Sequence, residues 1–489
     1  MLKRGLIIAI ILLTFYLPNA VSAQAPTLDQ QLFDRVDEYV ARQFRQNALT
    51  GGSYAIVHQG TIVAAKGFGV ADDHTQAPVG PETIYSTASV TKAFTAAAIL
   101  RLYEQGLIDL DAPVQRYIPW FSYRDPNASA KVTIRHLLTH SAGVDRFAAD
   151  GSIFQNERQN RNSLENGVRA LRTVDVVAEP GTQGAYCNTC YNTLGLLIEK
   201  VTGIDYEQYL QETLFQALDL ERTSFDPANA ASEYNWLFGQ KHKSAPNNQV
   251  FGESQNPEGG IYSTVLDLSK FLAAMQEQGL QTYLSRKTLA MAHKGEVNTG
   301  SEGVFYTLSG FEERTLYGQR LLYKSGDGIG SSAMIVMLPE QQIGISILVG
   351  DSVPEFAEPL VEGIVAILLG ETPQEVQISI TFWKLAGYIA LGFTIVGLIL
   401  LVLLLRSLFS LRNSPKLAPT WWLICRSLLC AIVGLPLAYL MIAVRPTQIA
   451  FYGYPYDLAI GLLALSVPSL LWLIYSLLLL FGSKRLFAR

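Results

Sequence analysis

The amino-acid sequence predicts an α+β domain followed by membrane-spanning helices, and two patterns carry that prediction. Strand-like runs open and close the central region, with helical runs between them. The strands are therefore expected to meet in one antiparallel sheet, flanked by helices and interrupted by an all-helical subdomain. Long uncharged apolar stretches then end the chain. Its 489 residues leave room for roughly two to four domains.

Each expected helix or strand follows from the local spacing of apolar residues. Apolar residues that recur three and four positions apart predict helices at 28–45, 88–104, 134–139, 191–201, 206–217, 265–276 and 354–369. Alternating and β-branched residues predict strands at 53–58, 61–66, 314–323, 332–338 and 343–349. Gln59-Gly60 and the segment 339–342 are the expected turns between neighbouring strands.

Both ends of the chain carry signs of export or membrane insertion. A basic pair, an apolar run and a small-residue pattern ending at Ala23 predict a cleaved signal peptide at 1–23. Near the other end, three uncharged stretches are each close to the length that crosses a bilayer. They predict three transmembrane helices, at 385–405, 427–444 and 458–481.

The distribution of positive charge predicts the orientation of these helices. Basic residues follow the first and third stretches, at Arg406, Arg412, Lys416, Arg426, Lys484, Arg485 and Arg489. Only Arg445 lies between the second and third stretches, so the first loop and the C-terminus are expected in the cytoplasm, with Arg426 reaching the headgroups. The expected layout is a signal peptide at 1–23, an extracytoplasmic domain at 24–370, a linker at 371–384 and a multi-pass domain at 385–489 in the cell membrane.

Composition, the cysteines and the histidines limit the classes of partner and cofactor that the chain is expected to bind. A net charge of −5 with 16% charged residues argues against a nucleic-acid partner. Cys187 and Cys190 are expected to be buried small residues in an exported region where a disulfide is permitted, with a redox-sensitive dithiol as the alternative. His136 and His140 have a spacing that a metal can use, but no third ligand accompanies them, so no metal is expected.

The segment Ser89-Val-Thr-Lys92 stands at the start of an expected helix. A spacing of three places the Ser89 hydroxyl and the Lys92 amine on one helical face, within reach of each other. A serine hydroxyl becomes a good nucleophile when a base takes its proton, and the start of a helix offers free N–H groups to a developing oxyanion. By itself, however, the pattern is more often an N-cap serine with an exposed lysine.

Two further motifs supply complementary groups. Tyr186-Cys-Asn188 offers a phenol as a second candidate base and an amide that can position Lys92 or a substrate carbonyl. Lys324-Ser325-Gly326, at the end of a strand-like run, offers a cation, a hydroxyl and a residue without a side chain, beside which a substrate backbone can lie. The three motifs together predict one pocket.

With these motifs the sequence resembles the serine β-lactamase and penicillin-binding-protein superfamily. It is most similar to the branch with a Tyr-x-Asn element, which holds class C β-lactamases, DD-peptidases and related esterases. The resemblance covers about 32–350 and implies the β-lactamase/transpeptidase-like fold, whereas nothing in 385–489 belongs to the pattern. Further stretches typical of the branch stand at 110–114, 134–143, 180–195 and 259–268.

The resemblance also implies roles for the motif residues. Ser89 is implied as the acylated nucleophile, with Lys92 and Tyr186 as the pair that handles its proton; which of the two takes the first proton stays open. Asn188 is implied as a positioning amide and Lys324 as the electrostatic partner. The oxyanion hole is implied to consist of the backbone N–H groups of Ser89 and Asp327, and no cofactor is implied.

Three positions depart from the usual pattern. Ser325 stands where threonine is commonest and keeps the hydroxyl, and Cys187 replaces a frequent serine. Asp327 stands where a small neutral residue is expected, and a carboxylate there repels an anionic substrate terminus. This last departure weakens the expectation of a β-lactam or a D-alanyl carboxylate as substrate.

The expected function is therefore an extracytoplasmic, membrane-tethered serine hydrolase that forms an acyl-enzyme with an amide, ester or β-lactam. Its expected partners are the lipid bilayer and a small-molecule or peptide substrate. A narrower alternative is a true β-lactamase or DD-carboxypeptidase. From other classes, the alternatives are a receptor that binds β-lactams or peptidoglycan and a non-catalytic scaffold of the same fold.

Overall fold

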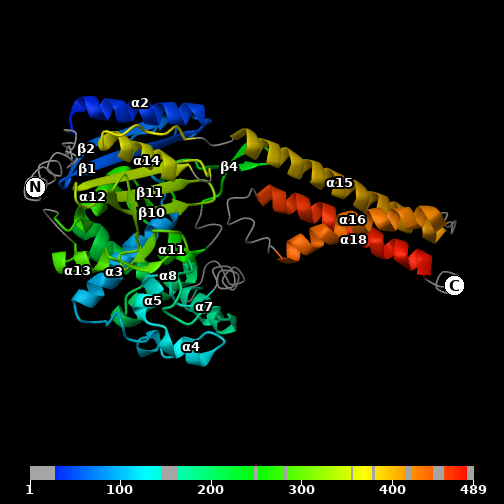
Figure 1. Ribbon diagram of the computed structural model, residues 1–489, viewed down its shortest axis with the longest axis horizontal. Helices are drawn as coiled ribbons and strands as arrows, with labels where there is room; N and C mark the ends of the chain where they lie inside the picture. The colour runs from blue at the N-terminus through cyan, green and yellow to red at the C-terminus, as the bar shows by residue number, and fades with distance from the viewer. Residues whose placement is uncertain are drawn as a thin grey trace, which may run out of the picture.

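The computed structural model shows a folded domain from which the C-terminal helices project to one side (Figure 1). The predicted signal peptide lies outside the described residues. The structure describes residues 28–144, 163–246, 252–278, 283–353, 356–376, 380–413, 420–443 and 456–481.

An eight-stranded sheet forms the centre of the domain, with the strand order β2-β1-β12-β11-β10-β9-β8-β7 and antiparallel pairing throughout. Its strands are β1 (Gly51–His58), β2 (Thr61–Gly69), β7 (Gly295–Asn298), β8 (Phe305–Thr307), β9 (Glu312–Leu316), β10 (Gln319–Asp327), β11 (Ser332–Leu338) and β12 (Ile343–Val349). Early β1 pairs with late β12, with Gly52 opposite Val349. This pairing confirms that strands from both ends of the domain meet in one sheet.

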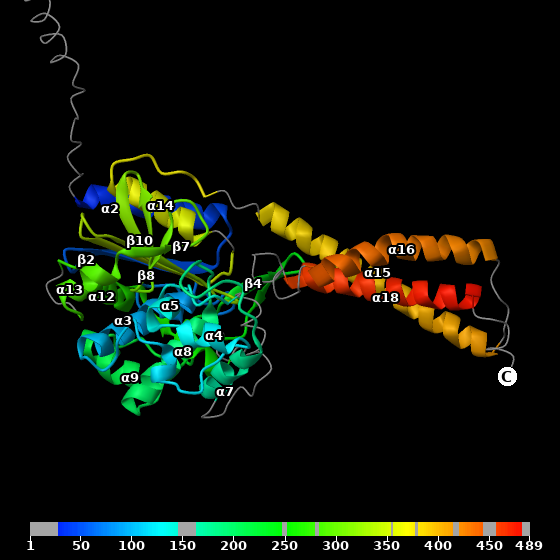
Figure 2. The ribbon, with the colours of Figure 1, turned by 60° about the horizontal axis from the view of Figure 1, so that its bottom comes forward.

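Helices cover both faces of this sheet because successive strand side chains point to opposite sides. Met334 and Val336 pack with α2 (Gln30–Gln46) and α14 (Ala357–Leu368) on one face. The alternate residues, such as Ile335, belong to the core shared with α12 (Val265–Met275) and the helical subdomain on the other face. Figure 2 shows the sheet between these two helical layers.

The helical subdomain lies between the two groups of strands in sequence, as predicted. Its helices are α3 (Thr91–Glu104), α4 (Pro126–Lys131), α5 (Ile134–Leu138), α7 (Ser163–Ala170), α8 (Asn188–Thr202), α9 (Tyr206–Leu210) and α11 (Asn256–Gly259), and α13 (Arg286–Ala292) follows beside the sheet. Two small antiparallel ribbons accompany them, β3 (Tyr85–Ser86) with β6 (Tyr262–Ser263) and β4 (Tyr234–Leu237) with β5 (Gln240–Lys243).

One predicted element is wrong in detail. The single strand expected at 314–323 is a hairpin that turns at Tyr317-Gly318 between β9 and β10. Both turn residues have positive φ, 50° at Tyr317 and 72° at Gly318, which is the geometry of a two-residue hairpin loop. Tyrosine is an unusual residue in that position, so the apolar pattern alone conceals the turn.

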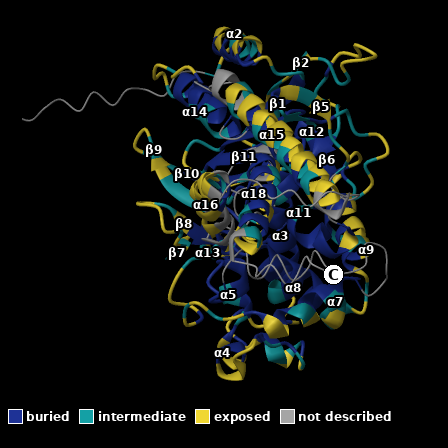
Figure 3. Ribbon diagram, turned by 90° about the vertical axis from the view of Figure 1, so that its right-hand side faces the viewer, coloured by how far each residue is buried: buried dark blue, intermediate teal, exposed yellow. Residues whose placement is uncertain are grey.

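The C-terminal helices are α15 (Ile380–Asn413), α16 (Thr420–Ala443) and α18 (Tyr456–Phe481). Lys384–Ser410 and Ile460–Leu479 are long and apolar enough to cross a membrane, whereas α16 offers only the shorter apolar stretch Leu423–Leu437. Many of their large apolar residues are exposed. Figure 3 shows much of the α15 ribbon in the colour of exposed residues. Two clear candidate spans therefore stand where three were predicted.

The Arg426 side chain contacts a neighbouring C-terminal helix. Its Nε donates a hydrogen bond to Ser476 Oγ at 2.8 Å, and its guanidinium lies 4.3 Å from the centroid of the Trp472 ring. Both partners belong to α18, so Arg426 points into the helical bundle because a polar partner and an aromatic face are available there.

Candidate active site

Ser89 is held in a tight turn directly before α3. The turn is the 3₁₀ segment Ala88–Val90, and Ala88 has a φ of 44°, a strained value for a residue with a side chain. Thr87 donates from both its backbone N and its Oγ1 to Ile261 O, each at 2.9 Å, and Ile261 N donates to Thr91 Oγ1 at 3.2 Å. These bonds clamp both sides of the turn and fix the position of the Ser89 hydroxyl.

The structure brings Ser89, Lys92 and Tyr186 into direct contact. Lys92 Nζ donates to Ser89 Oγ at 3.2 Å, as the spacing of three predicted. Tyr186 OH donates to the same oxygen at 2.9 Å from a segment 97 positions later in the chain. Lys92 is fully buried, with a relative exposure of 0%. The hydroxyl therefore has both predicted proton-handling groups within hydrogen-bond distance.

Lys324 completes the cluster from the sheet. Its Nζ lies 4.8 Å from the centroid of the Tyr186 ring, and Lys92 Nζ lies 5.1 Å from the same centroid. The Tyr186 ring is thus close to two cationic side chains, and Lys324 is 2% exposed. The four residues on which the predicted chemistry depends therefore share one neighbourhood.

Gly326 lets strand β10 approach Ser89 closely. A β-carbon built at Gly326 would lie 2.9 Å from the backbone N of Ser89 and 3.0 Å from that of Val90. No side chain fits there, which explains the glycine two residues after Lys324. Asp327 follows at the strand end, exposed to solvent, and its Oδ1 accepts from Ser332 Oγ at 3.2 Å.

Asn188 and Ser325 border this cluster through their neighbours in the chain. Asn188 is the first residue of α8, buried and two positions after Tyr186. Ser325 is half-buried on β10 between Lys324 and Gly326, opposite Met334 of β11. Their positions agree with the predicted pocket, and their roles stay predictions.

Two glutamates that the motif reasoning missed stand behind the two lysines. Lys92 Nζ donates to Glu258 O at 2.8 Å and to its carboxylate at 3.4 Å. Lys324 Nζ pairs with Glu312 at 3.2 Å. Burying a lysine costs much less when a carboxylate accompanies it, so these pairs make the buried cations tolerable. Glu258 precedes the Gly259-Gly260 stretch that the resemblance marks, whereas no motif surrounds Glu312.

His140 supports Tyr186 instead of standing as a metal ligand candidate. Its ring stacks on the Tyr186 ring with centroids 4.5 Å apart, and its Nδ1 accepts from the backbone N of Cys187 at 3.0 Å. His136, by contrast, accepts at Nδ1 from Thr133 N at 3.3 Å and belongs to the cap of α5. Within the described part of the chain, no group of three or more potential ligands gathers to hold a metal ion.

Cys187 and Cys190 are buried, as predicted, and they form a disulfide, which the interpretation as buried small residues did not include. Cys187 is also the N-cap of α8, where its Sγ accepts from the backbone N of Cys190 at 3.1 Å. The bridge joins the N-cap of α8 to its first turn, and Cys187 stands between Tyr186 and Asn188 in the chain. The disulfide therefore constrains the backbone that presents the phenol to Ser89.

Comparisons with known proteins agree with this arrangement. A family profile described as Beta-lactamase matches residues 33–367. Protein flp of Staphylococcus aureus strain N315 is 25% identical over 459 residues, which cover 91% of this chain and 90% of that protein. The human serine beta-lactamase-like protein LACTB, mitochondrial, is 25% identical and covers 58% of this chain and 67% of its own. The flp match extends beyond the profile into the C-terminal region.

Solved structures share the fold of the domain. The octameric penicillin-binding protein homologue from Pyrococcus abyssi has a TM-score of 0.62 and 29% identity, covering 70% of this chain and 79% of that chain. EstCE1, described as a hydrolase with promiscuous acyltransferase activity, has a TM-score of 0.60 and 22% identity, covering 70% and 99%. The β-lactamase/D-alanine carboxypeptidase from Pseudomonas syringae has a TM-score of 0.57 at 22% identity and 99% coverage of its own chain.

Proposed function

Since this chain belongs to the beta-lactamase family, we propose that it is a serine hydrolase in which Ser89 attacks a carbonyl and forms an acyl-enzyme. The substrate class is an amide, ester or β-lactam. One observation carries the proposal: Ser89 Oγ lies 3.2 Å from Lys92 Nζ and 2.9 Å from Tyr186 OH in a clamped turn. A hydroxyl placed between an amine and a phenol is poised to lose its proton as it attacks.

We assign Tyr186 as the base of the acylation step. Three acceptors surround Lys92 Nζ: Ser89 Oγ, the Glu258 carbonyl oxygen and the Glu258 carboxylate. Because an ammonium group carries three N–H donors, this surrounding suits a protonated Lys92, which is not the base. To act as the base, Tyr186 first releases its own hydroxyl proton to solvent, and the resulting phenolate is close to two cations, which stabilise its charge. The proton of Ser89 thus passes to the Tyr186 oxygen, and from there to the leaving group.

The oxyanion of the tetrahedral intermediate is proposed to bind the backbone N–H groups of Ser89 and Asp327. The close approach of Gly326 to the Ser89 amide supports this pairing, because it brings the end of β10 against the nucleophile turn. Donors of this kind contribute roughly 3 to 4 kcal/mol to transition-state stabilisation. Water activated at Tyr186 with Lys92 then hydrolyses the acyl-enzyme, while Asn188 positions the carbonyl.

The protein is proposed to be tethered in the cell membrane with its hydrolase domain outside the cytoplasm. Two helices of suitable length and hydropathy support tethering. Because α16 packs against α18 through Arg426 and Ser476, α16 is the proposed third span. The basic residues at 406–426 and 484–489 support a cytoplasmic first loop and C-terminus. Protease accessibility of the domain in intact cells or spheroplasts tests the orientation.

The decisive experiment on the chemistry is intact-mass detection of a covalent adduct. Wild-type protein is treated with a fluorophosphonate or a penicillin, beside Ser89→Ala and the matched control Ser301→Ala, which changes an exposed loop serine. We expect one adduct on the wild type and on the control, and none on Ser89→Ala. An unlabelled wild type, or a labelled Ser89→Ala, contradicts Ser89 as nucleophile.

Turnover separates the remaining alternatives. Because the exposed Asp327 carboxylate repels an anionic substrate terminus, we expect faster turnover of a short p-nitrophenyl ester than of a chromogenic cephalosporin. The reverse order favours a true β-lactamase. A stable penicillin adduct on Ser89 with no turnover of either substrate favours the receptor, and a properly folded protein that takes no label favours the scaffold.

A further inference from the structure

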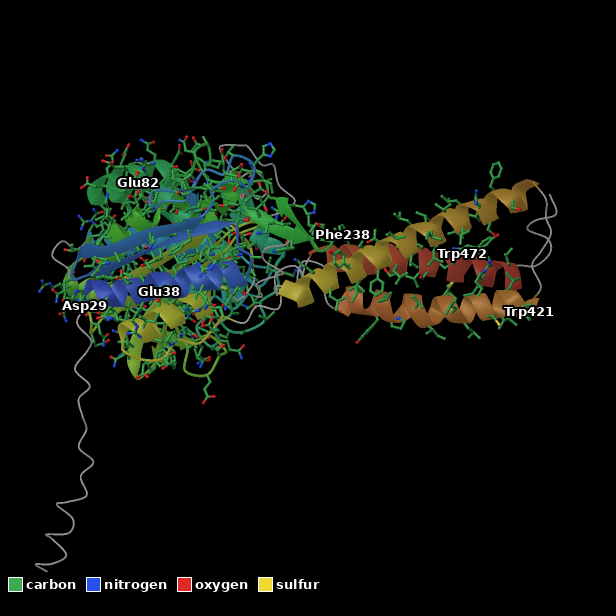
Figure 4. The ribbon with its side chains drawn as sticks, turned by 90° about the horizontal axis from the view of Figure 1, so that it is seen from above. Asp29, Glu38, Glu82, Phe238, Trp421 and Trp472 are labelled. Atoms are coloured by element: carbon green, nitrogen blue, oxygen red, sulfur yellow. A yellow bond between two sulfur atoms is a disulfide. The ribbon has the colours of Figure 1, made fainter. Side chains whose placement is uncertain are left out.

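The β4–β5 hairpin reaches from the hydrolase domain to the first C-terminal helix. It turns at Phe238-Gly239, where φ is 49° and 74°. The turn rests on α15, because a β-carbon built at Gly239 would lie 2.8 Å from the Tyr388 ring and 3.0 Å from Lys384 O. Gln240 Nε2 also donates to Tyr388 OH at 3.2 Å. Figure 4 shows Phe238 at the point where the domain meets the helices.

The hairpin tip lies at the depth where the apolar surface of α15 begins. The candidate span starts at Lys384, and the next large apolar side chains are exposed, with Leu385 at 56% and Tyr388 at 49%. A hydrocarbon core of ~30 Å needs about 20 helical residues, which from Leu385 lead to Arg406 on the other side. A tip that packs on 384–388 is therefore level with the headgroups of the outer leaflet.

The side chains of the hairpin suit that depth. Trp236 has two ammonium groups near its ring, Lys384 Nζ at 5.2 Å and Lys241 Nζ at 5.6 Å. Trp236, Leu237 and Phe238 are all half-buried, so each keeps apolar surface exposed. Tryptophan with neighbouring lysines is typical of membrane interfaces, where one end of the side chain is apolar and the other hydrated. Lys241 also pairs with Asp351 at 2.7 Å, so the tip offers apolar and aromatic surface more than net charge.

The base of the hairpin contacts two segments that flank the candidate active site, near Ser86 and Gly330, which we call its rim. Tyr234 N donates to Gly330 O at 3.0 Å, in the turn between β10 and β11 that follows Asp327. Glu233, one residue before β4, accepts from Ser86 N at 2.7 Å, three residues before Ser89. Because a four-residue strand spans ~13 Å, the rim lies on the order of 13 Å from the tip.

We propose that the β4–β5 hairpin docks the hydrolase domain on the lipid bilayer that α15 crosses, so that the active site acts on substrates anchored in that bilayer. The occupant of the tip is the boundary between headgroups and acyl chains. The substrate is an ester, amide or lactam carried on a membrane-anchored molecule, with its reactive bond outside the headgroups. The inference rests on the proposed membrane-tethered hydrolase and adds the surface that orients it.

The depth of the tip is measured with an environment-sensitive nitrobenzoxadiazole label on single cysteines. The full-length protein carries Cys425→Ser and Cys430→Ser, because these two cysteines are free, and is reconstituted in phosphatidylcholine nanodiscs with spin-labelled lipid. Gln240→Cys reports the tip, Ile395→Cys reports the span and Leu107→Cys reports the solvent-exposed domain. With a quencher near the headgroups, we expect the tip label to be quenched at least about twofold more than the Leu107→Cys label, and with a quencher in the acyl chains we expect the Ile395→Cys label to be quenched.

The outcomes of the depth measurement distinguish failure of the hairpin docking from failure of the membrane span. Quenching at Ile395→Cys with a solvent-like tip label overturns the docking and leaves the membrane span intact. An unquenched Ile395→Cys label overturns both the span and the docking, while turnover of a soluble ester separately reports on the hydrolase.

A second pair of variants tests the consequence for substrates. A β-carbon at Gly387 would clash with the backbone N of Gly239, so Gly387→Leu displaces the hairpin from α15. Gly392→Leu is the matched control, because a β-carbon there meets nothing within 4 Å. The substrates are a p-nitrophenyl ester in solution and the same ester tethered to a lipid by a hydrophilic spacer. We expect Gly387→Leu to lower turnover of the tethered ester about tenfold while leaving the soluble ester within about twofold.

The pattern across substrates then decides the inference. Equal loss on both esters means that the variant damages the cleft, and equal retention means that docking does not present the substrate; either result overturns the proposal. A wild type that hydrolyses neither ester instead points to failure of the proposed hydrolase.

Discussion

The buried carboxyl of Glu233 makes the stability of the domain depend on pH. Burial raises the pKa of Glu233 from its ordinary 4.5 to about 7, although the hydrogen bond from Ser86 N opposes the shift. Its Oε2 has no hydrogen-bond partner among the described residues. The folded protein therefore holds the Glu233 proton at a pH where the unfolded chain has released it. The free energy of folding that protonated Glu233 contributes is complete below pH 4.5 and is lost as the pH rises through about 7.

The size of the effect follows from the shift in pKa. A displacement from 4.5 to about 7 corresponds to about 3 kcal/mol of folding free energy. Glu233→Gln keeps the shape and can accept the Ser86 N–H, but it stays uncharged at every pH. Between pH 5 and 8.5 the free energy of unfolding of the variant should therefore rise above that of the wild type, by up to about 3 kcal/mol at the upper end. For a domain of this size, that is on the order of 5 °C in apparent Tm.

The assay is thermal unfolding of the full-length proteins in one detergent at matched scan rates, between pH 5 and 8.5. Glu38→Gln is the control, since Glu38 is exposed on α2 and its substitution removes the same charge. We expect the Tm difference between Glu233→Gln and the wild type to grow with pH, while Glu38→Gln stays parallel to the wild type. Parallel curves for Glu233→Gln as well would refute the reasoning.

Three further predictions concern the active site. Glu258→Gln weakens the pair with Lys92 and should lower kcat on a p-nitrophenyl ester roughly 10- to 100-fold with a smaller change in KM, whereas an unchanged kcat contradicts a role for the carboxylate. Replacing Cys187 and Cys190 together by serine should lower stability by about 2 kcal/mol, measured by thermal unfolding, because a bridge over so short a loop removes little chain entropy. Gly326→Ala places a methyl group against the amide of the nucleophile and should abolish adduct formation while circular dichroism stays native; a variant that still labels at the wild-type rate refutes the close approach.

Local patterns in the sequence predicted most of the elements and half of the site. The spacing of Ser89 and Lys92 predicts their contact, because residues three apart lie on one face of a helix. Strands β11 and β12 and their turn appear where alternating residues placed them. The hairpin turn at Tyr317-Gly318 was missed, because its first residue carries no turn preference.

The distant contacts required the fold. Tyr186 and Lys324 lie 138 positions apart, and Lys324 Nζ lies over the Tyr186 ring only because β10 packs on the turn before α3. The complementary groups of their motifs predicted one pocket, but not which of these groups would touch. Glu258 and Glu312 could not be assigned as partners of the lysines, since a carboxylate in a sequence shows nothing about which cation it faces.

The sequence by itself determined which segments are apolar, which are periodic and which carry a serine and a lysine within one helical turn, because these are properties of neighbouring residues. Only the tertiary structure decided that the Tyr186 phenol meets Ser89 with Lys324 beside its ring, that Cys187 bonds Cys190, and that the β4–β5 hairpin lies on α15. Those contacts depend on packing between segments far apart in the chain. Local periodicity constrains such packing only weakly.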